Sequence, residues 1–311
     1  MDEADDLIPV IVIAGPTAVG KTELAVQVAE ALNGEILSAD SASVYRGLDI
    51  GSAKPNPAER QRVRHHLIDV VDPTEPFSVA DFKRLAEDAV RDIVARGKTP
   101  VITGGTGLWI RALVRDFQLP PEAGQTPLRE ALLKLGEKDS FASLRRQLRV
   151  VDPESFGAIQ ANDHRRLVRA LEVFFVTGHR LVRTPSQKTP YKTQYWVLTR
   201  TVSELHQRIL ARVQAMLAEG LTDEVGRLLR AGVSPNAQAL SSIGYREMVA
   251  WYYGLLTADE RDQLTVRHTQ LFAKRQLTWF RSEKDARWLD LTAWPMEKAV
   301  DKIVQTYRQN T

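Results

Sequence analysis

A glycine-rich segment near the N-terminus has the residue types that bind phosphate. Residues 15–22 read Gly15-Pro16-Thr17-Ala18-Val19-Gly20-Lys21-Thr22 and fit the spacing G-x-x-x-x-G-K-T. Glycines let backbone N–H groups turn toward phosphate oxygens, and a helix N-terminus adds positive charge. Lys21 supplies a full charge, and the Thr22 hydroxyl can hold Mg²⁺. The segment predicts a bound di- or triphosphate with Mg²⁺ as cofactor; the alternative is a glycine-rich turn with a solvated lysine.

The acid that usually accompanies this loop in nucleotide hydrolases is missing. In those enzymes an apolar strand ends in an aspartate that helps to hold the metal ion. Here the strand predicted at residues 99–103 runs into Gly104-Gly105-Thr106-Gly107, and only the strand predicted at 35–39 is followed by an acid, Asp40. Ligands of open α/β sheets bind at such strand ends. Asp40 is therefore a candidate general base or metal-orienting group, rather than a simple turn residue.

The elements around these residues predict an α/β fold. Apolar, β-branched runs at 10–14, 35–39 and 99–103 are typical of buried parallel strands. Helices with apolar residues on one face lie between them, and Ser78 with Asp81 forms a capping box at the start of one. This alternation predicts a P-loop NTPase-like parallel sheet with helices on both faces.

The pattern changes after about residue 115. From 116 to 189 the chain reads as helices and loops, and over 115–200 there are 15 Lys/Arg against 9 Asp/Glu. A strand at 195–198 is expected to return to the sheet, and a long helix follows it. The prediction is a core of 1–115 and 190–311 with an all-helical, basic insertion at 116–189.

Composition excludes several classes of protein. Cysteine is absent from the 311 residues, which excludes disulfides, thiolate zinc sites and a cysteine nucleophile. No apolar run approaches the ~18 residues of a membrane span. The acidic start, residues 1–6, is unlike a targeting peptide, so we expect a cytoplasmic protein, and we expect a monomer. The net charge of +3 is too small to establish a nucleic-acid partner.

A series of short motifs runs along nearly the whole chain. After the phosphate loop come Asp40-Ser41 with Tyr45, Gly51-Ser52-Ala53-Lys54-Pro55, His65-His66-Leu67-Ile68-Asp69 and Gly104-Gly105-Thr106-Gly107-Leu108. Further on come Asn162-Asp163, Arg165-Arg166-Leu167, Arg169-Ala170-Leu171-Glu172, Ile243-Gly244-Tyr245-Arg246, Ala273-Lys274-Arg275-Gln276 and Thr278-Trp279-Phe280-Arg281. Together they resemble the bacterial tRNA dimethylallyltransferase (isopentenyl-tRNA transferase) family over about residues 10–290. Trp109 stands where the family usually has Tyr.

The resemblance implies transfer of a dimethylallyl group from dimethylallyl diphosphate to the exocyclic amine of the adenosine 3′ of the tRNA anticodon. Diphosphate leaves, so its charge must be stabilised. The family's roles map Asp40 onto the general base, and Lys21, Thr22, Thr106 and Arg212 onto the diphosphate. Arg208, one helical turn before Arg212, is the alternative arginine. Because attack falls on carbon, no hydrolase-type acid is needed.

The resemblance also implies a tRNA anticodon stem-loop as partner. The family positions near the tRNA map onto Asp40, Ser41, Ala42, Ser43, Arg165, Arg166, Leu167, Val168, Arg169, Ser242, Gly244, Tyr245 and Arg246. A basic helix face can instead be merely solvated. For the Trp279-Phe280 pair we expect packing in the core rather than stacking on a base. For His65-His66 we expect a structural role rather than a catalytic one, and no metal site.

Three other functions fit parts of the pattern. A P-loop kinase of a small metabolite would turn over ATP, and its lid would be smaller than the predicted insertion. A prenyltransferase acting on free adenine nucleotides would not need the basic insertion. A nucleotide-gated RNA-binding scaffold would not need Asp40.

Overall fold

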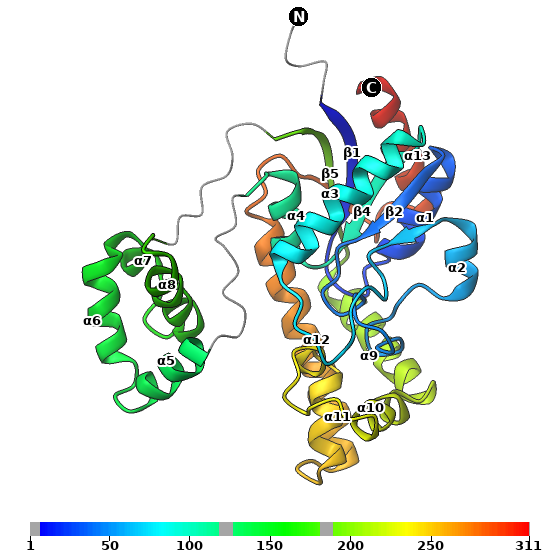
Figure 1. Ribbon diagram of the computed structural model, residues 1–311. Coiled ribbons are helices and arrows are strands. Elements are labelled where there is room, and N and C mark those ends of the chain that lie inside the picture. The colour runs from blue at the N-terminus through cyan, green and yellow to red at the C-terminus, as the bar shows by residue number, and fades with distance from the viewer. Residues whose placement is uncertain (1–6, 118–126, 181–188, 311) are drawn as a thin grey trace, which may run out of the picture. The chain divides into compact units, whose positions relative to one another are not determined.

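The computed structural model describes residues 7–117, 127–180 and 189–310. The chain divides into two compact units, one of residues 1–116 and 188–311 and the other of residues 117–187. The predicted boundaries were 115 and 190. Figure 1 labels most of the helices and strands of the two units.

Six parallel strands form the sheet of the first unit, in the order β3-β2-β4-β1-β5-β6. Their bounds are β1 Ile8–Ala14, β2 Gly34–Ser38, β3 His65–His66, β4 Thr99–Gly104, β5 Tyr191–Thr199 and β6 Arg287–Asp290. In the middle of the sheet, Ile11 on β1 pairs with Val101 on β4 and with Gln194 on β5. The carboxyl ends of β1, β2 and β4 therefore meet at one edge of the sheet, where the candidate site residues follow.

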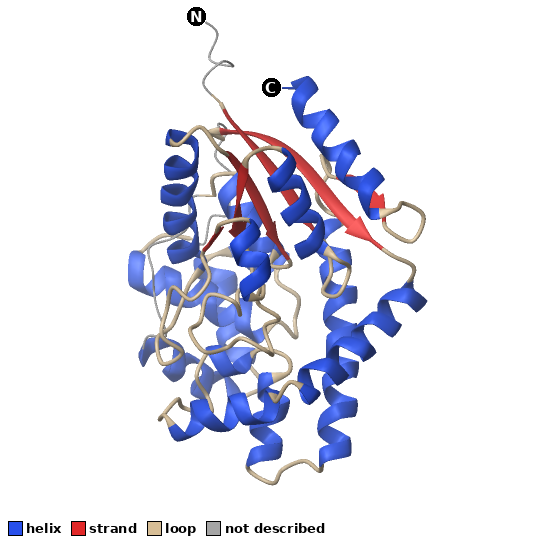
Figure 2. Ribbon diagram, turned by 90° about the vertical axis from the view of Figure 1, so that its right-hand side faces the viewer, coloured by secondary structure: helices blue, strands red, loops and turns tan. Residues whose placement is uncertain are grey.

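Helices cover both faces of this sheet, as Figure 2 shows. Alternate side chains of β1 belong to different cores: Val10 and Val12 to one, Ile11 and Ile13 to the other. The first core is completed by α3 (Val79–Ala95) and α4 (Gly107–Val114), the second by α1 (Lys21–Ala31) and α13 (Met296–Asn310). Each fully buried aliphatic side chain of this kind contributes about 1.5–3 kcal/mol of hydrophobic free energy.

The described part of the first unit has five further α-helices. They are α2 Pro57–Arg62, α9 Val202–Ala218, α10 Leu221–Arg230, α11 Tyr245–Tyr252 and α12 Ala258–Phe280, with a short 3₁₀ turn at Ala239–Ser241. The three that matter for the site are α9, α11 and α12, because they carry side chains to the edge where β1, β2 and β4 end.

Over residues 127–180 the second unit consists of helices joined by turns. It contains α5 Pro127–Glu137, α6 Ala142–Val151, α7 Pro153–Ala158 and α8 His164–Thr177 around a small apolar core. Glu172 on α8 is completely buried and forms ion pairs with Arg129 at 2.6 Å and Arg169 at 2.9 Å. Because an unpaired buried charge is costly, these arginines stabilise the packing of α5 on α8.

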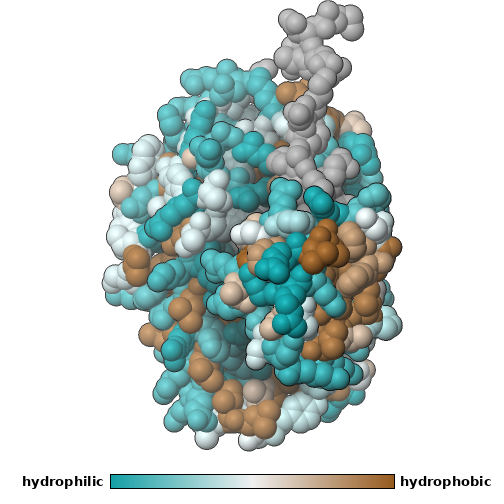
Figure 3. Space-filling view, turned by 90° about the vertical axis from the view of Figure 1, so that its left-hand side faces the viewer, coloured by the Kyte–Doolittle hydropathy of each residue, from teal (hydrophilic) through white to brown (hydrophobic). Residues whose placement is uncertain are grey.

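Among the described residues, none of the helices is long and apolar enough to cross a membrane. Hydrophilic residues predominate on the face shown in Figure 3, with hydrophobic residues in smaller patches between them.

The predicted fold class is confirmed, and the differences are strand lengths and two short strands that were missed. The strands expected at 10–14, 35–39 and 99–103 are β1, β2 and β4, and Ser78 and Asp81 cap α3 reciprocally. The strand expected at 195–198 is longer, and two short strands, β3 and β6, were not predicted. Both are short edge strands with few apolar residues: β3 is two half-buried histidines, and β6 has one buried residue, Leu289. Trp109, the departure from the family pattern, stacks on Phe82 inside the core.

Candidate active site

The phosphate loop lies between β1 and α1, as its spacing predicts. Gly15 and Gly20 have φ of 149° and 109°, values that L side chains rarely adopt. A Cβ atom at Gly15 would also lie 2.7 Å from the carbonyl oxygen of Leu198 on β5. Glycine at both positions is therefore required for this loop conformation.

Three cationic side chains hold the carbonyl groups of this loop. Lys21 Nζ donates to the carbonyl oxygen of Pro16 at 2.7 Å, and Arg208 Nε donates to that of Ala18 at 2.8 Å. Arg200, which follows β5, donates from Nε to the carbonyl oxygen of Val19 at 2.9 Å. In a planar trans peptide the N–H points opposite to the C=O. Arg208 and Arg200 therefore fix the direction of the N–H groups that follow these carbonyls.

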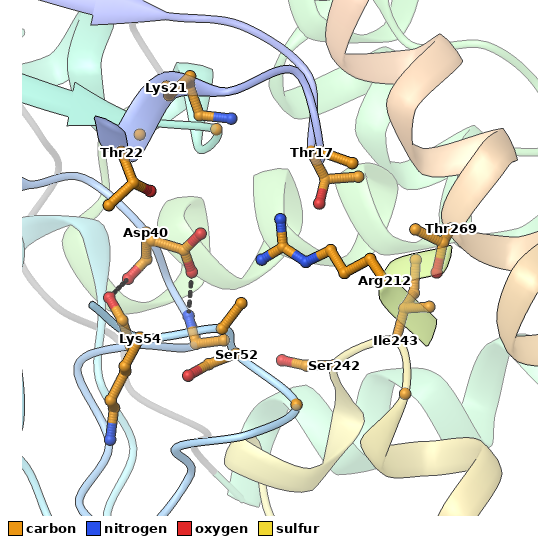
Figure 4. Close-up of a pocket in the computed structure, with 18 of the residues that line it drawn as sticks. Thr17, Lys21, Thr22, Asp40, Ser52, Lys54, Arg212, Ser242, Ile243 and Thr269 are labelled. Atoms are coloured by element: carbon orange, nitrogen blue, oxygen red, sulfur yellow. Dashed lines mark hydrogen bonds between the residues drawn. The ribbon is translucent and has the colours of Figure 1, made fainter. Parts of the chain in front are cut away.

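Asp40 lies two residues beyond the end of β2, facing the phosphate loop. Its Oδ1 accepts a hydrogen bond from the backbone N–H of Ala42 at 2.9 Å, which fixes the carboxylate. Figure 4 shows Lys21 and Thr22 on one side of Asp40 and the Arg212 guanidinium pointing toward it from the other. A carboxylate thus faces two cations across an open space.

Burial and the negative charge of Asp40 act in opposite directions on the pKa values of these two cations. Burial, together with the nearby Arg212 guanidinium, lowers the pKa of Lys21 to about 7, although Asp40 acts in the opposite direction. Burial also lowers the pKa of Arg212, again opposed by Asp40. Both cations are poorly solvated here, so an anion that entered the space would gain strong electrostatic stabilisation.

Thr106 connects the ends of β2 and β4. Its Oγ1 accepts the backbone N–H of Ser41 at 3.1 Å, and its hydroxyl donates to Ser41 Oγ at 3.4 Å. The two segments approach so closely that a Cβ atom at Gly104 would lie 2.1 Å from the carbonyl oxygen of Ala39. The glycines that replace the hydrolase-type acid therefore allow Thr106 to lie beside the Asp40 segment.

A cavity of about 840 Å³ brings most of the predicted residues together, all within the first unit. Its wall includes Thr17, Ala18, Gly20, Lys21, Thr22, Asp40, Ser41, Ala42, Ser43, Thr106, Arg208, Arg212, Ser242, Gly244 and Arg246. Arg212 makes no hydrogen bond to any described residue, whereas Arg208 is bonded to the phosphate loop. All the N–H groups of the Arg212 guanidinium are therefore available to a ligand, whereas Arg208 has only its two terminal NH₂ groups available.

One predicted residue, Tyr245, lies behind the wall of the cavity. Tyr245 is fully buried, and its hydroxyl donates to Glu224 Oε1 at 2.7 Å and accepts the N–H of Ser52 at 3.2 Å. Glu224 also accepts the N–H groups of Asp49 and Ile50 at 3.0 and 2.9 Å. The Tyr245 side chain thus holds the wall of the cavity in place and does not face the cavity.

The arginines predicted on α8 belong to the second unit. Arg165 and Arg166 are exposed, and Arg166 pairs with Asp163 at 3.2 Å. Leu167 and Val168 are buried in the apolar core of the unit, so their side chains are unavailable to a ligand. Arg169 is engaged with the buried Glu172.

The histidine pair has structural contacts. His65 and His66 form β3, where His66 Nε2 lies 2.7 Å from the buried Glu35 and His65 Nδ1 lies 2.8 Å from the carbonyl oxygen of Val63. Within the described ranges no group of three His, Cys, Asp or Glu side chains could hold a metal ion. Phe280 is fully buried and Trp279 packs against the same core.

Three functional contacts of the site were not predicted. Arg200 holds the phosphate loop, Glu224 holds the segment at 49–51, and Gln276 joins two loops of the site. Gln276 belongs to a motif of the family resemblance, but no spacing rule connects it with a loop 259 residues away. Arg200 and Glu224 had no signal in the sequence.

Comparisons with known proteins show the family of the chain. The family model described as IPP transferase matches residues 43–283. The chain belongs to the IPP transferase family. A relative named tRNA dimethylallyltransferase 2, from Geotalea uraniireducens (strain Rf4), is 45% identical over 294 residues, covering 93% of this chain and 94% of that protein. The tRNA dimethylallyltransferase of Desulforudis audaxviator (strain MP104C) is 45% identical over 91% of this chain and 92% of its own.

Solved structures of the family have the same fold. The tRNA isopentenylpyrophosphate transferase of Bacillus halodurans is 38% identical, with a TM-score of 0.74, and the match covers 97% of this chain and 96% of that one. A eukaryotic dimethylallyltransferase, described as acting on tRNA, is 26% identical with a TM-score of 0.81. That match covers 97% of this chain and 80% of the eukaryotic one. The family predicted from the sequence motifs is confirmed.

Proposed function

We propose that this protein transfers the dimethylallyl group of dimethylallyl diphosphate to the exocyclic amine of the adenosine 3′-adjacent to the anticodon in tRNA. The observation that carries the proposal is the position of Asp40 opposite Lys21, Thr22 and Arg212 in one cavity. A proton acceptor and an anion site thus face each other, as an alkyl transfer from a diphosphate requires. Family membership supports the same reaction.

The reaction forms one bond and breaks one. The lone pair of the adenine amine attacks the first carbon of the dimethylallyl group, and the bond from that carbon to the diphosphate oxygen breaks. Asp40 takes the proton that the amine loses, a contribution of about 10²–10⁴-fold. The hydrogen bond from the Ala42 N–H holds Oδ1, which leaves Oδ2 free to accept the proton.

The leaving diphosphate carries away negative charge, and the cavity offers positive groups to stabilise it. Lys21 and Arg212 supply full charges, Thr106 supplies a hydroxyl, and the loop supplies backbone N–H groups. Donors placed beforehand where charge develops are worth several kcal/mol each in a water-poor site.

Mg²⁺ fits the residues present, and we propose it as the cofactor. This ion keeps several waters and usually takes one or two protein ligands together with substrate phosphates. The Thr22 hydroxyl at the start of α1 is a hard oxygen group of that kind, beside the space that the diphosphate would fill. When bound, Mg²⁺ would neutralise part of the diphosphate charge.

For the tRNA, we propose that the second unit contributes affinity while the first unit holds the base. The exposed Arg165 and Arg166 suit phosphate contacts, and Ser242 and Arg246 lie on the cavity wall where the adenosine must enter. We further propose that the protein acts as a monomer in the cytoplasm.

The decisive experiment mixes the protein with unmodified tRNA, Mg²⁺ and dimethylallyl diphosphate, and analyses the digested RNA by mass spectrometry. A prenylated adenosine next to the anticodon is expected. Prenylation of free adenine nucleotides but not of tRNA would support the small-acceptor alternative. Steady ATP hydrolysis stimulated by a small alcohol would support the kinase alternative.

A further inference from the structure

The side chain of Gln276 closes one end of the phosphate loop. Gln276 lies on α12, is 6% exposed and lines the cavity. Its Oε1 accepts the backbone N–H of Thr17 at 2.9 Å, and its Nε2 donates to the carbonyl oxygen of Gly105 at 3.0 Å. One carboxamide therefore joins the phosphate loop to the loop that carries Thr106.

The orientation of this carboxamide is determined by its two partners. Thr17 offers a donor and Gly105 an acceptor, so an exchanged amide would place like groups against each other at both ends. The fit is also tight, because a Cβ atom at position 105 would lie 2.2 Å from Gln276 Nε2. Gln276 Oε1 is therefore held on the Thr17 N–H.

The N–H groups of the loop are consequently not equivalent. Pro16 has none, and the N–H of Thr17 is taken by Gln276. Among the described residues, no group accepts a hydrogen bond from the N–H of Ala18, Val19 or Gly20. A phosphate oxygen that approached the backbone N–H of Thr17 would meet the partial negative charge of Gln276 Oε1, because that donor is already taken.

We propose that Gln276 is a specificity residue that restricts this loop to two phosphates. The free N–H groups from Ala18 onward, with Lys21 and Arg212, bind a diphosphate. The third phosphate of a nucleoside triphosphate would extend to the Thr17 N–H, where the Oε1 end of the carboxamide fills the space and already occupies that donor. This inference deepens the proposed function, on which it rests, because it explains how a P-loop takes a prenyl diphosphate in a cell rich in triphosphates.

The test measures the binding of inorganic diphosphate and inorganic triphosphate by calorimetry in the presence of Mg²⁺, without tRNA or prenyl donor. The parent protein is expected to bind diphosphate more tightly. Gln276→Ala frees the Thr17 N–H, and since hydrogen bonds to charged groups are worth about 1.5–3 kcal/mol, the affinity ratio should shift about tenfold or more toward triphosphate. Gln263→Ala, an exposed glutamine of the same helix, should leave the ratio unchanged.

A second variant separates specificity from loop support. Gln276→Glu keeps an acceptor at Thr17 but adds negative charge and loses the donor to Gly105, so both anions should bind more weakly with no gain for triphosphate. The proposal is overturned if the parent binds triphosphate as tightly as diphosphate, or if Gln276→Ala leaves the ratio unchanged or loses both anions together. These readouts need no prenyl transfer, so failure of the proposed function would appear separately, as absence of modified tRNA.

Discussion

Binding of the prenyl diphosphate should take up a proton at Lys21. In the free site burial and Arg212 lower the pKa of this lysine to about 7. A diphosphate beside the ammonium group favours its charged form and raises that pKa again. The difference between the free and the bound pKa is the source of the proton uptake.

The size of the effect follows from the free-site value. At about pH 8 a group with a pKa of about 7 is roughly one-tenth protonated, so binding should take up roughly 0.9 of a proton. Affinity should then fall nearly tenfold for each pH unit above about 7, until the pKa of the complex is reached. Below about pH 7 Lys21 is already charged, and the affinity should level off with respect to this group.

Titration calorimetry in buffers of different ionisation enthalpy measures the protons taken up. Lys21→Arg is the matched control, because a guanidinium stays protonated throughout and leaves only the titration of the diphosphate itself. The parent should exceed this variant by close to one proton at about pH 8 and by much less at about pH 6. Equal uptake by the parent and the variant at about pH 8 would refute the assignment of the shifted group to Lys21.

Three further predictions concern other parts of the molecule. Asp40→Asn keeps the shape of the side chain but removes the proton acceptor, so single-turnover rates should fall on the order of 10²-fold with little change in tRNA affinity; a loss within about threefold would exclude Asp40 as the base. Arg165→Ala combined with Arg166→Ala should reduce the salt dependence of tRNA binding by one to two phosphate contacts, each about 0.7–0.9 in the slope of log K against log salt; equal slopes would mean that this face is only solvated. Tyr245→Phe removes a buried hydroxyl with two partners and should lower the free energy of unfolding in urea by about 1–3 kcal/mol, whereas the exposed Tyr252→Phe should not; equal unfolding curves would contradict the bracing role of the hydroxyl.

The second of these predictions differs from what the sequence motif alone would suggest. Arg165 and Arg169 share a helix face, so the pair looks like the natural double mutant. In the structure Arg169 neutralises the fully buried Glu172, and its removal would destabilise the second unit as well as alter any RNA contact. Arg165 with Arg166 tests the surface charge without that complication.

Much of the site was predictable because its signals are local. The phosphate loop is one unbroken segment between a strand and a helix, and its glycines are required by backbone angles that neighbouring residues set. Asp40 was predictable because it follows an apolar strand, and parallel strands place their ends at one edge of a sheet. The buried face of α3 was predictable from its helical periodicity, and its first residue from the capping box.

By itself, then, the sequence determined the family, the α/β class and the candidate residues of the phosphate loop and of the strand end at Asp40, since motif spacing and periodicity encode them directly. Only the tertiary structure decided which groups remain free to act. It placed Tyr245, Leu167 and Val168 inside, bonded Arg208 to the loop and left Arg212 open, and brought Gln276 across 259 residues to Thr17. The physical reason is that burial and hydrogen-bond partners are set by segments far apart in the chain, which no local pattern records.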